Sequence, residues 1–174
     1  MARDWESVFT TWAQGPGATE DQRCENAVRA IRAAIDQSGA LNRRNIQVFL
    51  QGSYRNRTNV RQESDVDVGI LCYDSFLMDL PEGYTRESFG IAPATYTYAA
   101  FKDEVEQALV AYFGRRSVTR GNKAFDIREN TYRVDADVIA CFEHRRYARD
   151  GRYESGVELI PDRGGRVINW PEQH

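Results

Sequence analysis

The sequence has few of the residues that build disulfide frameworks or zinc sites. Its three cysteines, Cys24, Cys72 and Cys141, are odd in number, widely spaced and each set in an apolar stretch. Only two histidines are present, and one of them is the last residue. These features argue against a disulfide-stapled fold and against a zinc module. We therefore expect the three thiols to be free and buried.

Long hydrophobic runs are also missing. No apolar stretch approaches the roughly 18 residues that span a bilayer, and the first residues, Met1 to Glu6, contain no apolar signal region. The chain is 41% hydrophobic and 28% charged over 174 residues. That length suits one domain with a real core and is too short for two ordinary domains. We expect a cytoplasmic protein without a membrane partner.

An excess of basic residues is absent too. The formal net charge is −3, whereas proteins that bind nucleic acid without sequence preference are usually strongly basic. The arginines gather locally instead, at Arg55, Arg57 and Arg61 and again between Arg145 and Arg152. This distribution favours a small polyphosphate ligand, and no long nucleic acid is expected as a partner.

Helical and strand-like patterns succeed one another along the chain. Helices are expected over Asp4 to Ala13, from an N-cap at Thr19 to Ser38-Gly39, and over Tyr98 to Phe113. Strands are expected over Ile46 to Leu50, Val66 to Cys72, Ser117 to Arg120, Ala124 to Arg128 and Tyr132 to Phe142, with a hairpin joining Gly156–Ile160 to Arg166–Ile168. The polar segment from Asp74 to Thr95 is expected to be a long loop. This order predicts an α/β fold of the α+β type, with a mixed, largely antiparallel sheet backed by helices.

Two aspartates alternate with apolar residues at the Val66 strand. Asp65 and Asp67 stand at positions i and i+2, so both carboxylates point to one face while Val66 and Val68 point to the other. Neighbouring carboxylates repel each other unless a cation or a proton compensates them, and Mg²⁺ prefers such hard oxygen ligands. A solvated strand edge with the same alternation is the alternative interpretation.

A glycine–serine pair and a later acidic strand help to decide between a Mg²⁺ site and a solvated strand edge. Gly52 lets backbone amides approach a ligand, and the Ser53 hydroxyl can donate to a phosphate oxygen, although a plain turn explains the pair in isolation. If the later strand is a neighbour, Asp135 or Asp137 completes a three-carboxylate cluster. Such a cluster can hold two cations about 3.5–4 Å apart for nucleotidyl transfer. Plain surface charge is again the alternative.

In combination these motifs resemble the polymerase-β nucleotidyltransferase superfamily. Gly52-Ser53 is followed by eleven residues, then by Asp65-Val66-Asp67, and later by a strand with a further aspartate. The likeness is closest to the cGAS/DncV-like nucleotidyltransferases of bacterial anti-phage systems. It extends over roughly Val48 to His174, and the segments that carry it are Gln51–Tyr54, Thr58-Asn59, Ser64–Asp67, Ala136–Ile139 and Ile168–His174.

The resemblance implies a role for each motif residue. Asp65, Asp67 and Asp137 would be the catalytic residues and the ligands of Mg²⁺, with Mn²⁺ as a possible substitute. Asp137 is preferred to Asp135 because the family's third aspartate stands directly before the apolar Val-Ile run. The triphosphate of the NTP substrate would be held by Gly52 and Ser53, and also by Lys123 or an arginine near Arg57.

The resemblance also implies a function and a boundary. We expect a Mg²⁺-dependent enzyme that makes a cyclic or linear oligonucleotide second messenger from NTPs and releases pyrophosphate. The family continues into a helical carboxyl-terminal half, so we expect residues 1–174 to be the catalytic core alone, weakly active or inactive, and able to self-associate through an apolar docking face. Two alternatives are a nucleotidyltransferase that modifies a protein, a tRNA or a small molecule, and a non-catalytic nucleotide-binding module.

Overall fold

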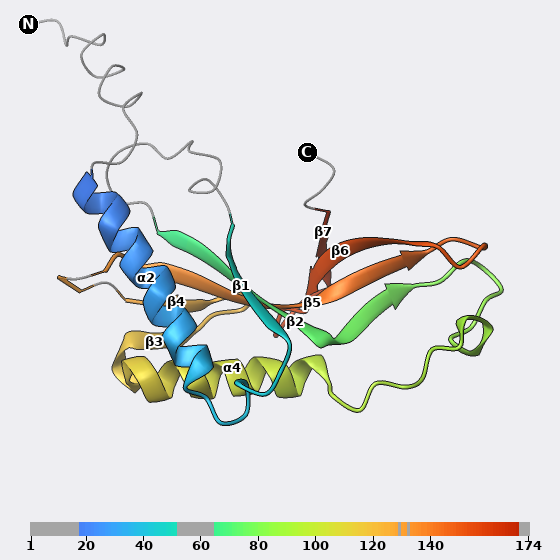
Figure 1. Ribbon diagram of the computed structural model, residues 1–174, viewed down its shortest axis with the longest axis horizontal. Coiled ribbons are helices and arrows are strands. Elements are labelled where there is room, and N and C mark those ends of the chain that lie inside the picture. The colour runs from blue at the N-terminus through green and yellow to red at the C-terminus, as the bar shows by residue number, and fades with distance from the viewer. Residues whose placement is uncertain (1–17, 52–64, 129, 132, 171–174) are drawn as a thin grey trace, which may run out of the picture.

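The computed structural model describes residues 18–51, 65–128, 130–131 and 133–170. In this part of the chain, two α-helices lie side by side against one sheet (Figure 1). The helices are α2 (Ala18–Asp36) and α4 (Tyr98–Phe113), with 3-10 turns at η1 (Glu87–Phe89) and η2 (Arg115–Ser117). The strands are β1 (Ile46–Leu50), β2 (Val66–Asp79), β3 (Val118–Arg120), β4 (Phe125–Ile127), β5 (Ala136–Tyr147), β6 (Tyr153–Leu159) and β7 (Val167–Asn169).

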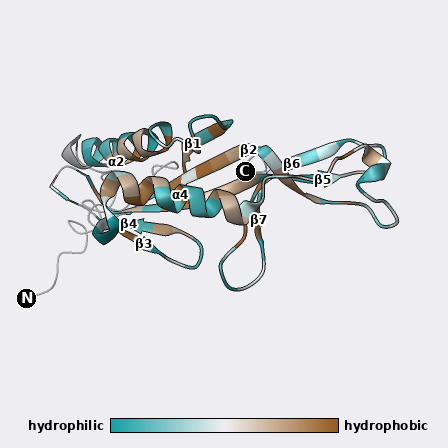
Figure 2. Ribbon diagram, turned by 90° about the horizontal axis from the view of Figure 1, so that it is seen from below, coloured by the Kyte–Doolittle hydropathy of each residue, from teal (hydrophilic) through white to brown (hydrophobic). Residues whose placement is uncertain are grey.

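The strands form one mixed sheet in the order β1-β2-β5-β4-β3, with β6 paired to β5 and β7 to β6. The central pair, β2 and β5, is parallel, and every other pair is antiparallel. This arrangement confirms the mixed, largely antiparallel sheet backed by helices that the element order predicts. Seen from below, β2, β5 and β6 continue well beyond the two helices (Figure 2).

The core lies between the helices and one face of the sheet. Alternate residues of β2 and β5, such as Val68 and Phe142, are buried toward the helices. The Phe142 ring stacks on Phe101 of α4 with 5.3 Å between ring centroids, and the Tyr98 hydroxyl donates to the Ala140 carbonyl. Because side chains alternate along a strand, the odd-numbered residues of β5 and of β2 up to its bulge after Cys72 point to the opposite face.

The helix ends follow local capping chemistry. The Thr97 side chain accepts a hydrogen bond from the Ala100 amide and so begins α4. Gly114 ends the helix with a positive φ of 84°, which glycine adopts without steric cost. The N-cap predicted at Thr19 is wrong, because α2 already begins at Ala18. The helix expected over Asp4 to Ala13 lies outside the described residues.

Three predicted strands have wrong boundaries, and tertiary pairing extends each of them. Strand β2 does not end at Cys72: after a bulge it pairs from Phe76 to Asp79 with β5, so the predicted loop starts only after Asp79. Strand β5 begins at Ala136 and continues to Tyr147, because β2 and β6 supply partners for its second half. Strand β6 begins at Tyr153, before the predicted start. The β6–β7 hairpin is confirmed.

Two further expectations concern residues of the described part. All three cysteines are free and buried, as predicted. No described helix has both the length and the apolar character needed to cross a bilayer.

Candidate active site

A row of acidic residues crosses three neighbouring strands. Asp67 of β2 and Asp137 of β5 are direct partners in the parallel register. On the other side of β5, Asp137 is the partner of Asp126 in β4. Asp67 and Asp137 are half-buried, and both stand on the face that the helices leave uncovered. The sheet therefore brings together the two carboxylates that the sequence places 70 residues apart.

The charges of this row act on one another. Burial, a hydrogen bond shared with Asp126, and the nearby charges of Asp126, Asp65 and Asp67 raise the pKa of Asp137 to about 6. Burial also raises the pKa of Asp67. An elevated pKa means that the folded chain leaves the negative charge of the row incompletely compensated. A cation would supply that compensation.

Asp126 is the residue that the sequence interpretation missed. The strand expected over Ala124 to Arg128 does place Asp126 on the face opposite to its buried neighbours Phe125 and Ile127. That alternation was a usable signal for the side on which Asp126 points. Nothing local to this short strand indicates that it pairs with β5, and only that pairing brings Asp126 to Asp137.

The geometry separates Asp137 from Asp135, the other candidate on this strand. Asp135 is exposed and precedes β5, and its backbone carbonyl accepts a hydrogen bond from the Val66 amide at 3.0 Å. Burial lowers the pKa of Arg133, and the nearby charge of Asp135 opposes part of that lowering. Asp137, by contrast, is the register partner of Asp67. The choice of Asp137 as third ligand remains a prediction, which the register supports.

The predicted triphosphate ligands are placed less directly. Gly52 and Ser53 lie outside the described residues, but the Gln51 amide donates to the Asp67 carbonyl at 2.8 Å, so β1 ends beside the acidic row. Lys123 lies in the exposed turn between β3 and β4. The neighbouring Asn122 ties that turn to the loop after β6 through its hydrogen bonds with Arg163. A role for Lys123 toward phosphate remains a prediction.

The donor chemistry of the row fits a divalent cation. Carboxylate oxygens are the ligands that Mg²⁺ prefers, and burial together with the neighbouring carboxylates raises the pKa of Asp137. Within residues 18–51, 65–128, 130–131 and 133–170, no three acidic, histidine or cysteine side chains already enclose a single point as a metal site would. Asp65, Asp67 and Asp137 therefore remain predicted ligands.

The chain resembles curated proteins over its whole length. No family model matches it. The chain is 41% identical over 174 residues to the cyclic dipyrimidine nucleotide synthase CdnE of Cecembia lonarensis, covering 100% of this chain and 59% of that protein. It is 43% identical over 178 residues to the synthase of the same name from Legionella pneumophila, covering 100% of this chain and 60% of that protein.

A solved structure agrees with these relatives. The Rhodothermus marinus CdnE c-UMP-AMP synthase, determined with Apcpp and Upnpp, superposes with a TM-score of 0.80 at 32% identity. The match covers 96% of this chain and 56% of that one. The chain thus spans about 60% of the length of the curated relatives that it matches. The likeness to cGAS/DncV-like enzymes and the nucleotidyltransferase fold, both expected from the motifs, are confirmed.

Proposed function

We propose, from the premise that this chain belongs to the cGAS/DncV-like nucleotidyltransferases, that it forms the catalytic core of a cyclic dinucleotide synthase in anti-phage signalling. The observation that carries the proposal is the pairing of Asp67 with Asp137 across two parallel strands. That pairing gathers the carboxylates which nucleotidyl transfer with two cations requires.

The predicted metal ligands and the Gly52-Ser53 pair each have a role in this proposal. Asp65, Asp67 and Asp137 hold Mg²⁺, and Ser53 with Gly52 orients the triphosphate. When bound, the cations neutralise phosphate charge and lower the pKa of the attacking hydroxyl. A ribose hydroxyl oxygen bonds to the α-phosphorus, the bond to the β-phosphate bridging oxygen breaks, pyrophosphate leaves, and the hydroxyl proton passes to solvent. A second transfer within the linear product closes the ring.

We further propose pyrimidine nucleotides as substrates. Both curated relatives described above are named as cyclic dipyrimidine synthases, and the Rhodothermus structure was determined with a uridine and an adenosine nucleotide analogue. UTP and CTP are therefore the first substrates to test. The product would be a cyclic dinucleotide that contains at least one pyrimidine.

The first test measures nucleotide binding. Titration calorimetry of UTP into the chain should show clearly tighter binding with Mg²⁺ than without it, and Asp67→Asn should remove the difference. Asn keeps the volume of Asp and removes its charge, so circular dichroism should report an intact fold. Equal affinity with and without Mg²⁺ in the wild-type chain would contradict the metal site.

The second test identifies the product. Radiolabelled NTPs are incubated with the chain, treated with phosphatase and separated by thin-layer chromatography, with the Legionella synthase as positive control. A phosphatase-resistant cyclic product supports the proposal, whereas label transferred to a protein, a tRNA or a small molecule would establish the alternative chemistry. Gel filtration of the same samples tests the expected self-association.

A further inference from the structure

An aromatic ring lies directly beside the acidic row. Phe49 of β1 is the register partner of Gly69 of β2, and Gly69 follows Asp67 by two residues on the same face of the strand. A Cβ atom at Gly69 would stand 2.6 Å from Cε1 of Phe49 and 2.9 Å from Nε2 of Gln51. The missing side chain therefore lets the Phe49 ring lie across the backbone of β2.

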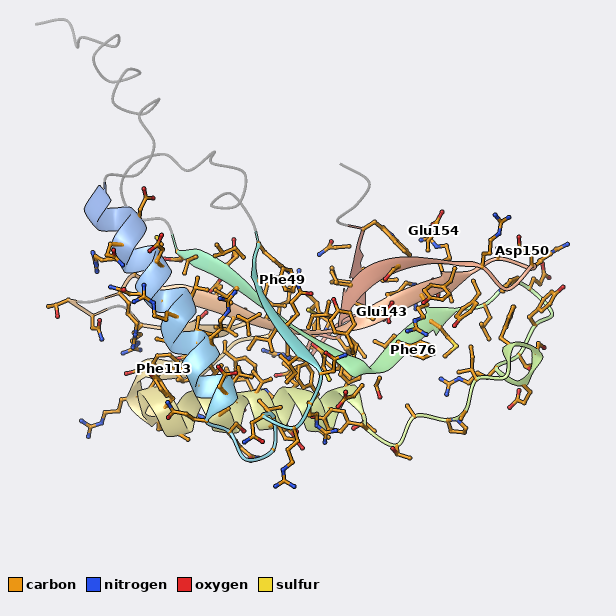
Figure 3. All side chains as sticks on the ribbon, in the orientation of Figure 1. Phe49, Phe76, Phe113, Glu143, Asp150 and Glu154 are labelled. Atoms are coloured by element: carbon orange, nitrogen blue, oxygen red, sulfur yellow. The ribbon has the colours of Figure 1, made fainter. Side chains whose placement is uncertain are left out.

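The ring is part of a small apolar surface, which we call the shelf and define as Phe49, Gly69 and Ile139. Ile139 of β5 is the parallel partner of Gly69 and follows Asp137 by two residues. Phe49 and Ile139 are only half-buried, although both pack against the core. Figure 3 shows Phe49 on β1 near the middle of the sheet. Apolar carbon is thus left accessible next to a row of carboxylates.

We propose that the shelf binds the base of the nucleotide whose phosphates the acidic row holds through its cations, an inference that rests on the function proposed above. A nucleotide joins a polyanion to a planar aromatic base, and the two neighbouring surfaces match these two parts. Gly69 lies about 7 Å along β2 from Asp67, at the rise of a β-strand, which leaves space for a ribose. Stacking on an aromatic ring tolerates any base, so the shelf contributes affinity and placement.

The decisive experiment compares a nucleotide with a ligand that lacks a base. Titration calorimetry in Mg²⁺ measures the affinities of UTP and of inorganic tripolyphosphate for the chain. We expect UTP to bind more tightly, and Phe49→Leu to weaken UTP roughly tenfold, within the range measured for lost base stacking. Tripolyphosphate should bind Phe49→Leu and wild type equally. Phe49→Trp keeps an aromatic face and should retain UTP affinity.

A matched control separates the shelf from general packing. Phe76 is also a half-buried phenylalanine of this sheet, but it lies farther along β2, away from Phe49 (Figure 3). Its ring is covered by the Arg145 guanidinium, which lies 3.9 Å from the ring centroid. Phe76→Leu should therefore leave the affinities for both ligands unchanged.

A second variant moves the ring without changing it. Gly69→Ala places a methyl group where the Phe49 ring lies, so the ring must shift. We expect Gly69→Ala to weaken UTP binding about as much as Phe49→Leu does. The double variant should be no weaker than either single one, because both remove the same contact.

Distinct outcomes overturn the shelf and the proposed function. If UTP binds wild type no more tightly than tripolyphosphate does, or if Phe49→Leu weakens both ligands equally, the shelf does not bind a base. If neither Mg²⁺ nor Asp67→Asn changes the affinity for UTP, the proposed catalytic function is wrong, regardless of the effect of Phe49→Leu.

Discussion

Replacing Asp162 with Asn should destabilise the chain strongly, although this carboxylate lies in a surface loop and its side chain is 36% exposed. Its partner Lys102 of α4 has a side chain only 2% exposed and donates from Nζ to Asp162 Oδ1 at 2.9 Å and to the Asn122 carbonyl at 3.2 Å. Arg120 of β3 donates from Nε to Asp162 Oδ2 at 2.8 Å. Asp162 thus compensates a buried ammonium group and joins α4, the β3–β4 turn and the loop after β6.

The size of the effect follows from burial. Removing one partner of a buried ion pair costs about 3–5 kcal/mol, and partial exposure of Asp162 screens the interaction. We therefore expect Asp162→Asn to lower the free energy of unfolding by about 2–3 kcal/mol at pH 7. For a chain of this length the loss corresponds to a fall in Tm of roughly 5–10 °C.

The same interaction has a defined pH dependence. Hydrogen bonds from Arg120, and then from Lys102, hold the pKa of Asp162 well below its ordinary value of 3.8. A carboxyl whose pKa is lowered by folding contributes stability above its unfolded pKa and loses it as the pH falls toward the folded value. The difference between wild type and Asp162→Asn should therefore be constant from pH 5 to pH 7 and shrink below about pH 4.

Urea unfolding followed by circular dichroism measures these differences. Asp103→Asn is the matched control, because Asp103 also pairs with Arg120, at 2.7 Å, but its side chain is 58% exposed; its loss should stay below about 1 kcal/mol. Lys102→Met should restore much of the stability of Asp162→Asn by removing the stranded charge. A loss below about 0.5 kcal/mol in Asp162→Asn, or no recovery in the double variant, would refute the reasoning.

Three further predictions concern the sheet and the acidic row. Gly156→Ala should lower the free energy of unfolding by about 1–3 kcal/mol in urea unfolding, because its Cβ would stand 2.8 Å from both the Asn169 carbonyl oxygen and Trp170 Cε3. A Cβ at Gly165 would meet nothing within 4 Å, so Gly165→Ala should leave the free energy of unfolding unchanged. Without metal, Asp137→Asn should match wild type in stability near pH 4 and exceed it by about 1–2 kcal/mol at pH 7. Burial and the neighbouring carboxylates raise the pKa of Asp137 to about 6, so its stabilising proton is lost as the pH rises. Equal Tm values of the two proteins at pH 7 would contradict this raised pKa. Asp137→Asn should abolish Mg²⁺-dependent UTP binding in calorimetry while Asp135→Asn retains it, and the reverse result would identify Asp135 as the third ligand.

Much of the candidate site could be predicted because its signals are local. Alternation on a strand is decided by backbone geometry alone, so the sequence predicted that Asp67 points away from the buried Val66 and Val68. The apolar face of α4 and the turn of the β6–β7 hairpin could be predicted because their signals are also local in the sequence. The order of helices and strands was enough to indicate a mixed sheet with helices against it.

Only the tertiary structure decided which strands are neighbours and in which register. That Asp67 meets Asp137, and that Asp126 joins them, depends on the pairing of β5 with β2 and β4. The same pairing extends β2 through Phe76 to Asp79, where the composition had predicted a loop. The burial of Lys102 could likewise not be predicted from the sequence, because its partner Asp162 lies 60 residues away. Such contacts gain free energy only once the chain has closed the intervening loops, so no local preference of the residues involved reveals them.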